Sequence, residues 1–140
     1  MCVSIFEDQS VPPSFAQRLC EISGDGATPV SIHSINENNF IRRYALANGH
    51  LFGVLIGLQT ENATSSWMDA TPYDFSNFAT GMPDEATGHY TRMRADGQWE
   101  SANDTDNYFV ACSIRETPPP AHSNVSLECP TSYFTGNSGE

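Results

Sequence analysis

Basic residues are scarce in this 140-residue chain. Six arginine and lysine residues stand against seventeen aspartates and glutamates, which gives a formal net charge of −11 at pH 7. The resulting field repels nucleic-acid phosphates and anionic lipid headgroups. Long apolar runs are also missing: the longest, between Leu51 and Leu58, is too short to cross a membrane. We therefore expect a protein that binds no nucleic acid and does not insert into a membrane.

Residue patterns typical of enzymes and zinc sites are absent as well. The cysteines have no Cys-x-x-Cys spacing, and His50, His89 and His122 lack the His-Glu-x-x-His arrangement. His33 and Ser34 are neighbours, but Ser34 begins a helix, where its hydroxyl is expected to bond backbone amides. His33 is expected to be a strand side chain. The sequence therefore predicts a protein that is not an enzyme.

Cysteines and glycosylation signals indicate an oxidising compartment. The cysteines are even in number and far apart in the sequence: Cys2, Cys20, Cys112 and Cys129. Three asparagines stand in Asn-x-Ser/Thr signals: Asn62, Asn103 and Asn124. The chain begins without a recognisable signal peptide, so either it is cytosolic or its natural N-terminus lies elsewhere. We expect a secreted, extracellular glycoprotein with glycans on these asparagines.

The order of hydrophobic patterns predicts an α+β domain with two helices beside an antiparallel sheet. Strands are expected at residues 2–6, 28–33, 51–58, 90–93, 98–99 and 108–114, and helices at residues 15–22 and 35–47. Ser14 is expected to cap the first helix. Ser34 and Glu37 are expected to form a capping box at the second. Asp96-Gly97 predicts a hairpin turn.

The segment after the buried strand is expected to carry the function. Between Gln59 and Asp106, aromatic residues alternate with Asp, Asn, Ser and Gly, a pattern typical of a long, internally packed loop. Binding residues occur often on loops that a rigid scaffold positions. We therefore expect the binding face between these two residues.

Several motifs together resemble the C-type lectin-like domain. In chain order they are Ala16-x-x-x-Cys20, residues 31–41, Leu55-Ile-Gly-Leu58, Trp67-Met-Asp69, Phe75-Ser-Asn-Phe78, Gly81-Met-Pro-Asp84, Gly97-Gln-Trp99 and Phe109-Val-Ala-Cys112. The resemblance implies a C-type lectin-like fold, with two helices flanking antiparallel sheets and a long irregular ligand-binding loop. It also implies a recognition module for a glycan or an extracellular protein.

The resemblance divides the chain into three parts. Residues 1–116 are similar to one domain without its N-terminal hairpin strand, residues 117–126 form a proline-rich linker, and residues 127–140 resemble the start of a following, truncated domain. The chain therefore resembles a segment of a tandem-domain secreted lectin. Cys2 and Cys129 either pair with each other or are both left free, and we expect pairing.

The remaining cysteines fit the family only in part. The resemblance implies a disulfide between Cys20 and Cys112, although four cysteines by themselves allow three pairings. The family's inner disulfide is missing, because Tyr90 and Asp104 stand at its positions. We therefore expect a long loop that lacks the usual covalent tie.

The resemblance implies a calcium site in the long loop, of which this chain keeps a part. Asp84 and Glu100 match ligand positions, whereas Met82 offers a thioether that calcium does not favour and Ser101 replaces a charged ligand. At most weak, millimolar calcium binding is expected, and the alternative is that both acids are ordinary solvated residues. The resemblance also implies a cis peptide bond at Pro83.

Candidate ligand contacts come from the same loop. Tyr73 and Phe75 are candidates for stacking on a sugar, and the acidic candidates for accepting hydroxyl hydrogen bonds are Asp84, Glu85 and Glu100. The other large aromatics are expected in the core: Trp67, Phe78 and Trp99. Two functions remain open. One is carbohydrate binding with weak or absent calcium dependence, and the other is calcium-independent protein binding or adhesion.

Overall fold

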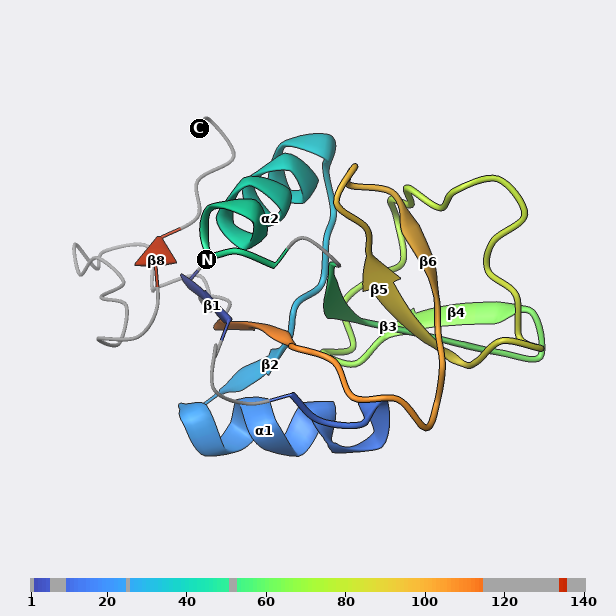
Figure 1. The fold of residues 1–140 in the computed structure, drawn as a ribbon, viewed down its shortest axis with the longest axis horizontal. Coiled ribbons are helices and arrows are strands. Elements are labelled where there is room, and N and C mark those ends of the chain that lie inside the picture. The colour runs from blue at the N-terminus through green and yellow to red at the C-terminus, as the bar shows by residue number, and fades with distance from the viewer. Residues whose placement is uncertain (1, 6–9, 25, 51–52, 115–133, 136–140) are drawn as a thin grey trace.

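The computed structural model describes residues 2–5, 10–24, 26–50, 53–114 and 134–135. Its elements are β1 (Cys2–Ile5), η1 (Pro13–Phe15), α1 (Ala16–Ser23), β2 (Ala27–Pro29), α2 (Ile35–Ala47), β3 (Val54–Glu61), β4 (Thr64–Trp67), β5 (Tyr90–Met93), β6 (Trp99–Ala102), β7 (Ala111–Ile114) and β8 (Phe134–Thr135). The strands form two antiparallel sheets, ordered β2-β7-β1-β8 and β4-β3-β5-β6. Helices α1 and α2 lie on opposite sides of the first sheet (Figure 1), which confirms the predicted α+β class.

Strand β3, expected at residues 51–58, runs over Val54–Glu61 instead, and residues 51–52 lie outside the described ranges; its apolar part is buried on both faces, as predicted. Val54, Ile56 and Leu58 contribute to the larger hydrophobic cluster, whereas Leu55 contributes to a second cluster that contains Cys20. Successive side chains of a strand point to opposite faces, so an unbroken apolar run fills two clusters at once. The strand thereby joins the two halves of the core and holds the base of the long loop.

The N-terminus of α2 has the predicted Ser34 cap, while the Glu37 side chain reaches back to the N–H of His33, one residue before the N-cap position of a standard capping box. The Glu37 backbone N–H donates to Oγ of Ser34 at 3.1 Å, and Oε1 of Glu37 accepts a bond of 2.7 Å from the His33 N–H. At the other end, Asn48 is the cap residue and Gly49 has a φ of 83°. Glycine adopts this left-handed conformation without steric cost, so the helix ends where the sequence predicts.

The prediction that Ser14 caps the first helix is wrong. Ser14 lies inside η1, and Phe15 at the N-cap of α1 makes no side-chain hydrogen bond. Pro13 begins the helical turn earlier than expected, because proline lacks the N–H that the first turn leaves unbonded anyway.

The second predicted strand is shorter than expected. It ends at Pro29 instead of His33. The N–H of Val30 donates to the carbonyl of Ala111 at 2.8 Å, while the Val30 carbonyl accepts a bond of 2.8 Å from Gly57. The chain therefore leaves the first sheet here and contacts β3 of the second.

A hairpin occupies the start of the predicted loop. Strand β4 pairs with β3 through a tight turn in which Asn62 and Ala63 have φ values of 52° and 63°. Positive φ at both central residues suits asparagine but not alanine, so the sequence lacks the usual Asn-Gly signal. The irregular part of the loop is residues 68–89.

Three further strand predictions are confirmed: β5 has the predicted limits, whereas β6 and β7 have altered ones. Strands β5 and β6 form the expected hairpin, with Gly97 at a φ of 87° in the turn. The closing strand β7 begins at Ala111, because Tyr108 makes only an isolated bridge with Val11.

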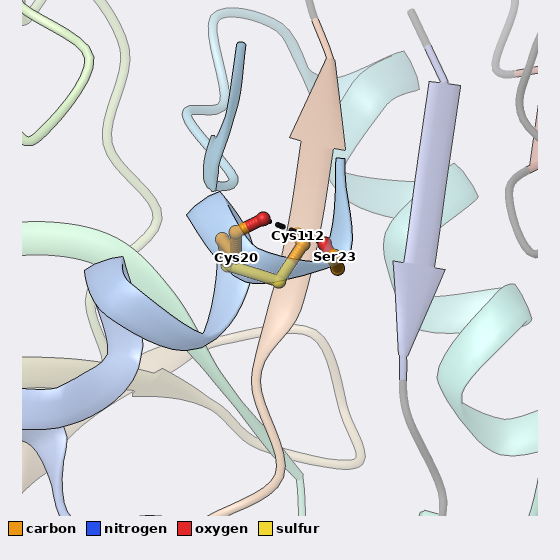
Figure 2. Close-up of a disulfide and its surroundings, with 3 residues drawn as sticks. All are labelled: Cys20, Ser23 and Cys112. Carbon is orange, nitrogen blue, oxygen red and sulfur yellow. Dashed lines mark hydrogen bonds between the residues drawn. A yellow bond between two sulfur atoms is a disulfide. The ribbon is translucent and has the colours of Figure 1, made fainter. Parts of the chain in front are cut away.

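The disulfide between Cys20 and Cys112 is confirmed. It joins α1 to β7 across a sequence separation of 92 residues (Figure 2). The hydroxyl of Ser23 donates to the Cys20 carbonyl at 2.6 Å, which closes the end of α1 beside the bond. No cysteine within the described ranges is free. Cys129 lies outside those ranges, so its pairing with Cys2 stays a prediction.

Much of the predicted C-terminal organisation falls outside the described residues. The predicted linker at residues 117–126 lies outside the described residues. From the predicted following domain, β8 is described, and its Thr135 pairs with Cys2 of β1. The division into domains stays a prediction. Across the described ranges, no helix has both the length and the apolar character that a membrane crossing requires.

Candidate ligand-binding site

The long loop is folded around the Trp99 side chain, which is fully buried. The rings of Trp67, Phe75 and Phe78 contact it edge-on, with centroid distances of 5.6, 5.9 and 5.5 Å. Edge-to-face contacts of this kind add to the stability from area burial. Trp67 and Trp99 are thus core residues, as predicted, whereas Phe78 is half-buried against this core. Phe75, a candidate ligand contact, is half-buried against the same core.

A buried asparagine links this aromatic cluster to α2. Oδ1 of Asn38 accepts a bond of 2.7 Å from the Trp99 indole N–H, and its amide nitrogen donates to the Gly97 carbonyl at 3.0 Å. Asn38 is only 1% exposed. Because a buried amide needs partners on both its oxygen and its nitrogen, these bonds fix the β5–β6 turn against the helix.

Tyr73 is the exposed aromatic candidate, and the residue that follows it is held by His33. Tyr73 is 43% exposed. Nδ1 of His33 lies 2.7 Å from Oδ1 of Asp74, and its Nε2 lies 2.9 Å from Oγ1 of Thr71. Thr71 also bonds Asp69 through both its hydroxyl, at 2.5 Å, and its backbone N–H, at 3.0 Å. The start of the loop is therefore tied to the segment before α2.

Asp84 and Glu85 bond backbone and hydroxyl donors of the chain itself. Asp84 closes its own turn: its carboxylate accepts from the Ala86 N–H and from the Thr87 hydroxyl, each at 3.1 Å. Glu85 accepts 2.8 Å bonds from the N–H groups of Asn62 and Ala63, so it locks the β3–β4 turn to the loop. Both acids act as structural acceptors here.

Glu100, the second candidate calcium ligand, is paired with Arg92. Oε1 of Glu100 accepts bonds of 3.0 and 2.7 Å from the guanidinium Nε and Nη2. The guanidinium of Arg92 is thus bonded to the carboxylate that the resemblance assigns to calcium. The Met82–Pro83 peptide bond is cis, as expected.

These residues do not fit a resident calcium ion. Calcium requires six to eight oxygen ligands. Both oxygens of Asp84 are engaged in its turn, and Glu100 is engaged by the guanidinium of Arg92. Among the described residues, no group of three or more His, Cys, Asp or Glu side chains is arranged to hold a metal ion. The carboxylates of Asp84 and Glu100 therefore bond groups of the protein itself.

The other end of the loop is held by His89 and Asp104. The carboxylate accepts from the His89 N–H at 2.9 Å and lies 3.0 Å from Nδ1 of the ring. The hydrogen bond that the His89 side chain makes to the Asp104 carboxylate raises the pKa of His89, and the hydrogen bond from the His89 backbone N–H lowers the pKa of Asp104. The pair lines a polar hollow of about 260 Å³ together with Gln59, Thr60, Glu61 and Tyr90.

Asp104 stands where the family has a cysteine of its inner disulfide. The resemblance places Tyr90 opposite it, whereas the structure pairs it with the neighbouring His89. An ion pair therefore occupies the place of a covalent bond. Sequence reasoning gave His89 no role, because a histidine and an aspartate 15 residues apart form no recognisable motif.

The histidine at the start of the loop was missed for the same reason. The contact of His33 with Asp74 spans 41 residues. The one local signal for His33 in the sequence is the adjoining cap of α2, where Glu37 fixes the His33 backbone N–H.

The structure describes two of the three predicted glycosylation sites. Asn62 and Asn103 are exposed. Asn124 lies outside the described residues. Glycosylation at all three stays a prediction.

Sequence comparison finds two curated relatives. Lymphocyte antigen 75 of Mus musculus is 28% identical over 94 residues, which are 66% of this chain and 6% of that protein. A phospholipase A2 inhibitor (clone 02/03/06/07) of Lachesis muta muta is 33% identical over 57 residues, which are 41% of this chain and 34% of that protein. The chain thus spans well under two thirds of each relative's length.

Structure comparison finds the same fold in solved lectins. The C-type lectin CEL-I from Cucumaria echinata superposes with a TM-score of 0.72 at 20% identity, covering 79% of this chain and 87% of that one. The C-type carbohydrate-recognition domain of cow CD23, solved in the presence of a GlcNAc2Man3 oligosaccharide, gives a TM-score of 0.66 at 25% identity, covering 82% and 87%. The predicted C-type lectin-like fold is therefore confirmed.

A family model identifies the domain directly. The model described as "Lectin C-type domain" matches residues 10–114, which include both helices, the disulfide and the whole long loop. Domains of this family are recognition modules without enzymatic activity, in agreement with the sequence prediction. With the fold, the disulfide and this match in agreement, the chain belongs to the C-type lectin domain family.

Proposed function

We propose that this domain is an extracellular recognition module that binds carbohydrate with weak or absent calcium dependence. The observation that carries the calcium part of the proposal is the Arg92–Glu100 pair, in which a guanidinium neutralises a carboxylate that calcium-dependent members would use for the metal. A loop that is held by hydrogen bonds and an ion pair within the protein needs no bound ion to keep its shape. The hydroxyl groups of a ligand would then hydrogen-bond to protein groups instead of coordinating a calcium ion.

The chemistry of the loop surface supports a hydroxyl-rich ligand. Tyr73 presents an exposed ring on which a sugar face can stack. The hollow beside β3 is lined by carboxylates of Glu61 and Asp104 and by Tyr90, and such groups accept hydroxyl hydrogen bonds. The oligosaccharide present with cow CD23 supports a glycan as the ligand class for this fold.

A glycan array with a matched pair of variants tests this proposal. The wild type is expected to bind a set of glycans equally in calcium and in EDTA. Tyr73→Ala is expected to weaken that binding about two- to tenfold, the range for loss of one aromatic contact. Phe15→Ala is the control, because Phe15 has the same 43% exposure but lies in η1, outside the loop between Gln59 and Asp106. Equal losses in both variants, or no glycan bound at all, would contradict the proposal.

A protein ligand is the second candidate function. One relative is named a phospholipase A2 inhibitor, and such a protein acts on a protein partner. On this alternative, the array is blank in both buffers and a panel of extracellular proteins gives a signal that Tyr73→Ala reduces and Phe15→Ala does not. Competition by free sugars separates the two functions, because only carbohydrate binding is displaced by them.

A further inference from the structure

The two glycosylation signals within the described residues lie at the same end of the second sheet. In the register of that sheet, Gln59 of β3 pairs with Tyr90 of β5, and Tyr90 pairs with Ala102 of β6. Asn62 follows the end of β3, and Asn103 follows the end of β6. Strands β3 and β6 are separated by two inter-strand spacings, about 10 Å. The two asparagines therefore stand at one end of the sheet, with the start of β5 between their strands.

The His89 side chain has contacts that lead to both asparagines. Nδ1 of His89 lies 3.0 Å from Oδ2 of Asp104, which is the next residue after Asn103. Nε2 of the same ring lies 3.9 Å from Oε1 of Glu85, and this oxygen accepts a bond of 2.8 Å from the Asn62 N–H. Because the two ring nitrogens face carboxylates that adjoin one asparagine and hold the other, His89 lies between the two signals.

The side chain of Asn103 has a fixed direction. Its Oδ1 accepts bonds of 2.7 Å from the Thr105 hydroxyl and 2.9 Å from the Thr105 N–H, which together form an Asx turn. The Asn103 backbone N–H donates to the hydroxyl of Tyr108 at 2.9 Å. Because the amide oxygen faces Thr105, the amide nitrogen, to which an N-glycan is attached, points away from it. The asparagine and threonine side chains of both signals are exposed, so a glycan has room at each.

The polar hollow of about 260 Å³ lies between the same two asparagines. Glu61, which precedes Asn62, lines it from β3, and Asp104, which follows Asn103, lines it from the other side. The His89 side chain lines it as well and is 47% exposed. An N-glycan is a bulky, hydrated surface group. Two such groups, each attached one residue away from a lining residue, leave little room for another molecule between them.

We propose that N-glycans on Asn62 and Asn103 cover this hollow and close it to other molecules, so that recognition by the long loop is confined to the part that carries Tyr73. The chain's own modification thereby decides which groups of the loop take part in binding. The extracellular location that exposes both asparagines to glycosylation rests on the proposed function. The covering of the hollow is measurable without a ligand.

Maleimides of two sizes test the cover in protein secreted from a eukaryotic cell line. Glu61→Cys places an exposed thiol at the wall of the hollow. The rate with a maleimide that carries a long polyethylene glycol chain, divided by the rate with a small maleimide, measures steric cover alone. Removing both signals with Thr64→Ala and Thr105→Ala is expected to raise this ratio severalfold, whereas Thr64→Ser and Thr105→Ser keep both signals and the low ratio. Tyr73→Cys is the control elsewhere in the loop, and its ratio is expected to stay the same.

Peptide mass spectrometry of the secreted protein must find a glycan on both asparagines, and an unmodified asparagine at either position overturns the proposal. An equal ratio with and without the two signals also overturns it. If the cysteine variants do not fold, diethyl pyrocarbonate modification of His89 decides: modification slowed by the glycans supports the cover, and equal rates contradict it. A covered hollow in a domain that binds no glycan on the array defeats the proposed function and leaves this inference intact. Glycan binding by a chain with unmodified asparagines does the reverse.

Discussion

The Asn38 side chain shows how a single polar residue can organise an aromatic core. Its two hydrogen bonds reach Trp99 and Gly97, which belong to the segment that the loop surrounds. Asn38→Ala leaves the buried indole N–H without its acceptor, so the free energy of unfolding is expected to fall by about 1–3 kcal/mol. Urea unfolding measures the change. Asn36→Ala, an exposed position on the same helix, is the control and is expected to have little effect. Similar losses in both variants would contradict this role.

The His89–Asp104 pair makes a second residue-scale prediction, which concerns pH. The pKa of His89 is raised from 6.5, so its contribution to stability is present below that pH and is lost as pH rises through the folded pKa. The pKa of Asp104 is lowered from 3.8, so its contribution is present above that pH and is lost as pH falls through the folded pKa. The ion pair therefore stabilises the fold most in the mildly acidic range between these limits.

Asp104→Asn tests this pH dependence with little change of shape. The midpoint of the His89 titration, followed by NMR, is expected to move down toward the ordinary value of 6.5 because the hydrogen-bonded carboxylate is gone. The difference in melting temperature between wild type and variant is expected to be larger at about pH 5 than at about pH 8. A His89 midpoint that does not move, or a difference that grows with pH, would contradict the assignment.

At the scale of elements, the two serines predicted as helix caps give a matched comparison. Ser34 accepts a bond from the Glu37 N–H, whereas Ser14 lies within η1 and caps nothing. Ser34→Ala is expected to lower the free energy of unfolding by about 1 kcal/mol, the usual value for a lost N-cap. Ser14→Ala is expected to change it by much less. Chemical denaturation of both variants checks the order, and the reverse order would refute the capping assignment.

The elements that sequence predicts well are those with local signals. Helix α2 has its cap, its apolar stripe and its terminal glycine in one continuous stretch, so its limits follow from the sequence. Strand β4 was missed, because Ala63 takes a positive φ that no local rule favours for alanine. The second strand is shorter than the sequence predicts, because its end depends on the hydrogen bonds of Val30 with Ala111 before β7 and Gly57 of β3.

The candidate site was less predictable than the fold. The residues Asp84, Glu85 and Glu100 could be named from the resemblance, but their partners could not. Arg92 meets Glu100 only because β5 and β6 pair in one particular register. The histidine contacts at the two ends of the loop span 41 and 15 residues, and such distances leave no pattern in the sequence.

At the scale of the whole molecule, the disulfide closes most of the domain. The bond between Cys20 and Cys112 encloses a loop with a sequence separation of 92 residues. In the chain-entropy model, a loop of this size contributes about 4–5 kcal/mol, a large share of the stability of an ordinary domain. The double variant Cys20→Ala/Cys112→Ala is expected to lose about that amount in denaturant unfolding. A loss below about 1 kcal/mol would show that the sheets and core hold the fold without the bond.

On the proposed function, the long loop keeps its shape through protein groups instead of a bound ion, and thermal unfolding in calcium tests this most directly. A site with a dissociation constant of about 1 mM would gain about 1.4 kcal/mol in 10 mM calcium, which raises the melting temperature by about 5 °C or more. We predict no rise beyond that seen in magnesium at the same ionic strength. A rise specific to calcium that grows with its concentration would contradict a loop held by Arg92, His33 and His89.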